Sequence, residues 1–153
     1  MKSVCFTGHR NLYISLELRQ KLYTTIEELI NAGVCDFYAG GAIGWDMLCE
    51  EAVIELRKKY NGIKLHLLLP CSAEEQTLKW NTYQKENYNK IYNDADSVEV
   101  MYSHYNSECM KKRNQELVNR ADCCICYCKS MRSGTGQTVQ MAMNKPIKII
   151  NLA

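Results

Sequence analysis

The sequence lacks a run of about eighteen apolar residues, the length that a membrane-spanning helix requires. It also lacks a basic N-terminal stretch followed by an apolar signal core, because a strand-like segment begins at Ser3. No linker, internal repeat or low-complexity tract interrupts its 153 residues. These absences predict one cytoplasmic domain over residues 1–153, with no membrane partner.

Nine cysteines are present, yet the paired spacing of a zinc site or of a disulfide framework is missing. Several of them fall in the apolar run Cys123-Cys124-Ile125-Cys126-Tyr127-Cys128. In a strand covered on both faces, cysteine packs as a small hydrophobic residue. We therefore expect reduced thiols in the core and no metal site.

Short apolar runs alternate with segments of helical period along the whole chain. This pattern predicts an α/β fold, a single Rossmann-like, doubly wound and mainly parallel sheet with helices on both faces. Ser72 and Glu75 form the capping-box pattern of a long helix that reaches toward Tyr92. Gln76 and Trp80, four residues apart, would then share one face of that helix. The expected strands are residues 4–7, 36–39, 64–69, 97–101, 122–127 and 147–150.

Three glycine-containing segments follow expected strands: Gly8-His9-Arg10, Gly40-Gly41-Ala42-Ile43-Gly44 and Ser133-Gly134-Thr135-Gly136. In open parallel sheets, ligands bind at the carboxyl ends of strands where the strand order reverses. Glycine lets an anion approach backbone amides, and the next helix adds free N–H groups and a positive dipole end. A tight turn explains any one segment equally well, whereas three at one sheet edge favour an anion pocket. The dinucleotide fingerprint G-x-G-x-x-G and the P-loop motif are both absent.

Individual side chains near these segments have two interpretations each. Asp46 either caps its helix or accepts a hydrogen bond from a ligand hydroxyl. Arg10 either forms a structural ion pair or holds a phosphate through its planar fork. Trp80 either packs in the core or stacks on a base, and we expect Arg113 on a helix face away from Leu117.

The order of these motifs resembles the YpsA-like branch of the SLOG superfamily, and the resemblance covers nearly the whole chain. The motifs that carry it are Gly8-His9-Arg10, Gly40-Gly41-Ala42-x-Gly44-x-Asp46, Pro70 with Gln76 and Trp80, Arg113-Asn114, and Gly134-Thr135 with Thr138-Val139. The resemblance implies a Rossmann-like fold related to the LOG, lysine decarboxylase-like and DNA-processing A proteins, and a nucleotide-derived ligand. The candidate ligand-binding residues are Gly8, His9, Arg10, Gly40, Gly41, Ala42, Gly44, Asp46, Gln76, Trp80, Arg113, Ser133, Gly134, Thr135 and Thr138.

The LOG enzymes use a motif P-G-G-x-G-T-x-x-E, and residues 132–140 are the corresponding segment of this chain. Gln140 stands at the position of the enzymes' glutamate, and Arg132 replaces the proline. An amide cannot transfer a proton as a carboxylate does, so these departures argue against LOG-type phosphoribohydrolase activity. Asp46 is the remaining candidate for a catalytic carboxylate.

The leading hypothesis is therefore the binding of a nucleotide or nucleotide-derived phosphate-bearing molecule, with no cofactor required. Sensing or regulation is one use that such binding could serve. The first alternative is a hydrolase that cleaves an N-glycosidic or phosphate ester bond with Asp46. The second is a nucleic-acid-associated protein with Lys111-Lys112-Arg113 as its basic patch. It ranks last because the net charge is only +2. A homo-oligomer is left open.

Overall fold

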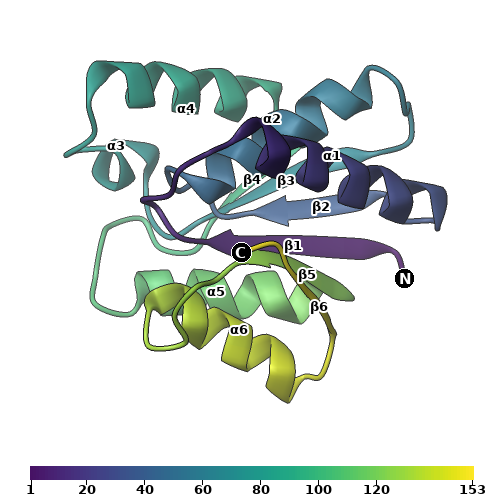
Figure 1. Ribbon diagram of the computed structural model, residues 1–153. Coiled ribbons are helices and arrows are strands. Elements are labelled where there is room, and N and C mark those ends of the chain that lie inside the picture. Colours follow the sequence, from purple (N-terminus) through teal and green to yellow (C-terminus); the bar gives the residue numbers. More distant parts are fainter.

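The computed structural model describes all 153 residues as a parallel sheet between two layers of helices (Figure 1). The sheet has the strand order β4-β3-β2-β1-β5-β6, and every neighbouring pair is parallel. After β4 the chain returns to the other side of β1, so the order reverses between β1 and β5. This confirms the doubly wound, Rossmann-like expectation. The strands are β1 (Ser3–Gly8), β2 (Asp36–Ala39), β3 (Lys64–Leu69), β4 (Ser97–Val100), β5 (Cys123–Tyr127) and β6 (Lys148–Asn151).

Helices cover both faces of the sheet. On one face, upper in Figure 1, lie α1 (Leu16–Asn31), α2 (Trp45–Arg57) and α4 (Thr82–Asp94). On the other face lie α5 (Cys109–Arg120) and α6 (Gly134–Asn144), and the short α3 (Ala73–Gln76) follows β3. None of these helices combines the length and apolar character that crossing a bilayer demands.

Two hydrophobic clusters fill the space between sheet and helices, because successive strand residues point to opposite faces. Phe6 of β1 belongs to the larger cluster, under α1 and α2, whereas its neighbour Cys5 belongs to the smaller one, under α5 and α6. Cys124 and Cys126 pack beside Cys5 and are fully buried. All nine cysteines are free thiols. The expected packing of the cysteine-rich strand is confirmed.

The single long helix expected from Ser72 onward is wrong. Ser72 does cap a helix, but α3 ends after one turn at Gln76, and α4 begins at Thr82. Asn81 forms a capping box: its side chain accepts the N–H of Gln84 at 2.8 Å, and the side chain of Gln84 accepts the N–H of Asn81 at 3.0 Å. These bonds satisfy N–H groups that a continuous helix would use internally, and they fix a new helix start.

Candidate functional site

A cleft of about 350 Å³ lies at the carboxyl ends of the central strands, and we call it the switch-point cleft. Its walls come from the end of β1, the loop before α2, the inner face of α5 and the start of α6. Segments more than a hundred residues apart in the sequence therefore meet at one sheet edge, as expected for this topology. The candidate residues that line it are Gly8, His9, Arg10, Ala42, Asp46, Arg113, Ser133, Gly134 and Thr135.

The N-terminus of α6 presents backbone N–H groups to this cleft. Ser133 is the N-cap, and its Oγ accepts the N–H of Gly136 at 3.0 Å. The first backbone bond of the helix runs from the N–H of Gln137 to the carbonyl of Ser133. The N–H groups of Gly134 and Thr135 come before this first bond and therefore have no acceptor within the helix, and both residues line the cleft. Such unsatisfied N–H groups, at the positive end of a helix dipole, favour an anion.

Arg10 adds a positive charge at the mouth of the cleft. The residue is exposed and takes part in none of the ion pairs of the structure. The structural ion pair considered for it is therefore not formed. His9, beside it, accepts the backbone N–H of Lys129 on Nε2 at 2.8 Å, which ties the β1 loop to the loop after β5. The guanidinium fork of Arg10 is left free to pair with a ligand.

The glycine loop after β2 differs from the sequence-based expectation, because its amides are already bonded within the protein. The N–H of Gly41 donates to Glu50 Oε2 at 3.0 Å, and the N–H of Ala42 donates to Asp46 Oδ2 at 3.2 Å. Of the candidate residues in this loop, only Ala42 lines the cleft. The loop therefore shapes the cleft wall, and the amides that face an anion come from α6.

Gly40 and Gly44 are needed for close approaches that any side chain would prevent. The carbonyl of Gly40 accepts hydrogen bonds from Arg113 Nη1 and from Gln76 Nε2. A Cβ at Gly40 would lie 2.5 Å from Arg113 Nη1. Gly44, with φ of +79°, is the N-cap of α2, and a Cβ there would lie 2.3 Å from the carbonyl oxygen of Arg10. Both glycines thus support the site without lining it.

Three buried ionisable groups lie at the cleft: Asp46 and Arg113 line it, and Glu50 follows Asp46 by one turn of α2. Asp46, Glu50 and Arg113 are 6%, 1% and 5% exposed. Burial, reinforced by the charge of Asp46, holds the pKa of Glu50 well above its usual value. Burial also raises the pKa of Asp46, although the guanidinium of Arg113 opposes the rise. Of the two carboxyl groups, Glu50 has the more strongly raised pKa, because the charge of Asp46 adds to the effect of burial there, whereas Arg113 is the largest opposing influence at Asp46.

Two side-chain placements differ from the sequence-based expectation. Gly44, not Asp46, caps α2, and Asp46 instead holds the loop before it while lining the cleft. Arg113 lies on the same buried face of α5 as Leu117 rather than on the opposite one, because residues four apart on a helix are neighbours.

A second cleft of about 440 Å³ adjoins the first, and we call it the aromatic cleft. Gln76 and Trp80 line it, from the end of α3 and from the connection to α4. They do not share a helix face as expected, because the chain breaks between them. The ring of Trp80 packs edge-on against Tyr88 with centroids 5.4 Å apart. Two residues, Arg10 and Met110, line both the aromatic cleft and the switch-point cleft. The full lining of the aromatic cleft is Arg10, Pro70, Cys71, Glu75, Gln76, Leu78, Lys79, Trp80, Tyr105 and Met110.

A sequence model of the YspA SLOG family matches residues 5–149. The chain belongs to the YspA SLOG family. This confirms the resemblance that the ordered motifs carry.

Relatives of this SLOG-family chain include a UPF0398 protein of Bacillus pumilus (strain SAFR-032), 31% identical over 112 residues that cover 72% of this chain and 57% of that protein. A UPF0398 protein of Staphylococcus aureus (strain JH9) is 26% identical over 111 residues, or 67% of this chain and 58% of that protein. The chain thus spans less than three fifths of the length of these curated relatives.

Two solved structures share the SLOG-family fold. DNA processing protein A from Helicobacter pylori, described for its single-stranded DNA binding mode, aligns with a TM-score of 0.68 and 18% identity over 97% of this chain and 63% of that one. TM1055 aligns with a TM-score of 0.62 and 18% identity over 97% of this chain and 72% of that one. At these identities the likeness concerns the fold.

Two further residues of this SLOG-family chain lie away from both clefts. Thr138 is fully buried, and its hydroxyl donates to the carbonyl of Gly134 at 3.3 Å within α6. Gln140 is exposed, and its amide donates to Asn144 Oδ1 at 3.1 Å. A proton-transfer group at position 140 would therefore not reach either cleft.

Glu50 is the site residue that sequence reasoning missed. It follows Asp46 by one helical turn, within a stretch of α2 that is almost entirely buried. An acidic residue among core positions of an amphipathic helix was the available signal, because buried carboxyl groups need a dedicated partner. That partner, the N–H of Gly41, depends on tertiary structure.

Proposed function

We propose that the switch-point cleft binds the phosphate group of a nucleotide or nucleotide-derived small molecule. The observation that carries the proposal is the convergence of the Gly134 and Thr135 amides with the unpaired Arg10 in one cleft. Backbone amides at a helix N-terminus and a guanidinium fork are the two donor types that suit phosphate best. The carboxylate of Asp46, in the same cleft, is placed to accept a hydrogen bond from a sugar hydroxyl.

The aromatic cleft supplies a place for the base of the same ligand. It is joined to the switch-point cleft through Arg10, and Trp80 offers an indole surface on which a base can stack. The two clefts together suit an elongated ligand with a charged end and a flat apolar end. Such a function needs no cofactor, and it is consistent with a sensing role.

Calorimetric titration at low salt with nucleoside monophosphates, nucleoside diphosphates and ADP-ribose tests this proposal. Arg10→Ala should weaken the binding of the best ligand about tenfold, because it removes a charge-assisted hydrogen bond. Arg19→Ala is the matched control, since Arg19 is exposed on α1 and lines neither cleft. The proposal fails if no member of the panel binds at millimolar concentration.

A hydrolase acting on an N-glycosidic or phosphate ester bond is the second candidate, favoured by one observation. Asp46 is a buried carboxyl group with a raised pKa in a cleft, which is typical of acid–base catalysts. Turnover of nucleoside monophosphates, followed by chromatography, should disappear in Asp46→Asn while binding persists. Binding without turnover in the native chain would rule this candidate out.

A nucleic-acid partner is the third candidate, and it draws on the fold shared with DNA processing protein A. Lys111 and Lys112 are exposed on α5 and would contact phosphates. A gel shift with single-stranded DNA at low salt tests it, because phosphate-driven binding weakens steeply with salt. A complex lost in Lys111→Gln/Lys112→Gln would support it, and no complex at low salt would remove it.

A further inference from the structure

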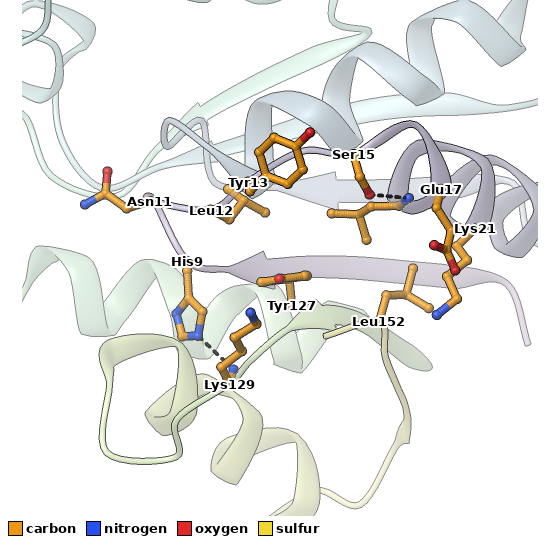
Figure 2. A pocket seen from close by; sticks show the side chains of 11 residues that line it. His9, Asn11, Leu12, Tyr13, Ser15, Glu17, Lys21, Tyr127, Lys129 and Leu152 are labelled. Atoms are coloured by element: carbon orange, nitrogen blue, oxygen red, sulfur yellow. Dashed lines mark hydrogen bonds between the residues drawn. The ribbon is translucent and has the colours of Figure 1, made fainter.

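A separate cavity of about 340 Å³ lies on the other side of His9, between the start of α1 and the ends of β5 and β6 (Figure 2). We call it the α1 cavity, and its walls include His9, Leu18, Lys21, Tyr127, Lys129 and Leu152. His9 is the only residue that it shares with the switch-point cleft, and none is shared with the aromatic cleft. The proposed function therefore makes no use of it.

Tyr127 brings an unpartnered hydroxyl to this cavity. The residue is 9% exposed, and its ring packs against Trp45 and, edge-on, against His9. The hydroxyl of Tyr127 forms no hydrogen bond within the protein. It is not fully buried either, because Trp45 Nε1 is the only fully buried side-chain nitrogen or oxygen atom that lacks a hydrogen-bond partner. The small part of Tyr127 that is accessible thus faces the cavity that it lines. A hydroxyl without a protein partner is available to a ligand.

Two lysines place positive charge at the ends of the cavity. The Nζ of Lys129 lies 5.7 Å from the ring centroid of Tyr127, and Lys21 extends from α1 at the other end (Figure 2). Neither ammonium group takes part in an ion pair. Glu17 is the single acidic residue of the lining, so two lysines and one glutamate leave a charge of +1. The cavity therefore attracts anions.

Apolar side chains form part of the remaining walls, beside the polar Asn11 and Ser15. Leu12, Leu18 and Leu152 line the cavity together with the rings of Tyr13 and Tyr127. A volume of about 340 Å³ suits a ligand with one ring, at the small end of ligand sites. We propose that the α1 cavity is a second binding site, for a small aromatic anion. The aromatic ring of this ligand lies between the leucines. Its charged group is held by the ammonium group of Lys129 and by the hydroxyl of Tyr127, while Lys21 adds positive potential from the other end of the cavity.

NMR titration of the isotope-labelled full chain with phenyl phosphate at low salt tests this site. Resonances of Leu18, Leu152 and Lys129 should shift together and saturate. Tyr127→Phe, which keeps the ring, and Lys129→Gln should each weaken binding about fivefold, the scale of one hydrogen bond or one surface ion pair. Lys85→Gln is the matched control and should leave the affinity unchanged, because Lys85 is exposed on α4 and lines none of the three sites. Inorganic phosphate and phenol, which each lack one half of the probe, should bind more weakly.

The same titration in Gly134→Ala separates this site from the switch-point cleft. Binding at the α1 cavity should persist unchanged in that variant, whose substitution lies only in the other cleft. Two results would overturn the assignment: shifts in the native chain that are confined to Gly134 and Thr135, or an affinity that is equal in the native chain, Tyr127→Phe and Lys129→Gln. The first result would instead support phosphate binding at α6, whereas the second would leave that proposal unaffected.

Discussion

Gly134→Ala should stabilise the protein and weaken its ligand binding at the same time. Gly134 is the first residue of α6, and its φ lies outside the left-handed region. A Cβ at this position would meet no heavy atom within 4 Å. Alanine at such a site stabilises by about 0.4–1 kcal/mol, chiefly by restricting the unfolded chain. For a domain of this size, Tm should rise by roughly 1–4 °C.

The same methyl group would project into the switch-point cleft, where a phosphate has to approach the amides of Gly134 and Thr135. Displacing one charge-assisted hydrogen bond removes about 1.5–3 kcal/mol, which corresponds to a tenfold to hundredfold loss of affinity. Calorimetric titration with the best ligand of the panel measures the affinity, and scanning calorimetry of the same samples measures Tm. Opposite changes in the two quantities separate a local effect from misfolding.

Two other glycines serve as controls for this substitution. Gly62→Ala also adds a methyl group with no heavy atom within 4 Å, but outside both clefts, so affinity should stay unchanged. Gly136→Ala should destabilise, because its Cβ would lie 2.3 Å from the carbonyl oxygen of Met131. A Gly134→Ala variant that binds as tightly as the native chain would refute the placement of the anion at α6.

The buried ionisable groups and the capping box of α4 give three further predictions. The raised pKa of Glu50 means that the folded state holds a proton that the unfolded chain releases above pH 4.5, so stability falls as pH rises from there toward the folded pKa. Glu50→Gln should reduce this decrease in the free energy of unfolding, which urea unfolding from about pH 5 to 8 measures. An unchanged dependence of the free energy on pH would contradict the raised pKa of Glu50. Arg113→Ala should destabilise by about 3–5 kcal/mol in urea unfolding at neutral pH, because Asp46 is left buried without its nearby cation. Asn81→Ala should cost about 1 kcal/mol in thermal unfolding, because the N–H of Gln84 loses its acceptor, and no loss would mean that the box is not formed in solution.

Much of the fold was predictable because its signals are local. The strands at residues 36–39 and 64–69 match the expectation to the residue, since a buried parallel strand reads as a short apolar run between turn residues. Ser15, a residue type favoured at helix starts, caps α1, and its Oγ accepts the N–H of Leu18 at 3.0 Å. The position of the cleft followed from topology, which brings the ends of β1 and β5 to one edge.

The details of the site were less predictable because they depend on contacts between distant elements. The glycine loop after β2 reads as an anion loop in the sequence. Its amides at Gly41 and Ala42, however, already donate to carboxyl groups of the same chain, nine and four residues further along. The carbonyl of Gly40 is held by Arg113, 73 residues away. The break between α3 and α4 was missed because Asn81 and Gln84 resemble ordinary helix residues until their side chains pair with each other's backbone.

An NMR titration of the isotope-labelled chain with AMP and with ADP-ribose tests the proposed phosphate site most directly. The amide resonances of Gly134 and Thr135 should move downfield and saturate with one of these ligands, because a phosphate oxygen accepts hydrogen bonds from those N–H groups. If both resonances stay in place at millimolar ligand, the start of α6 does not hold a phosphate.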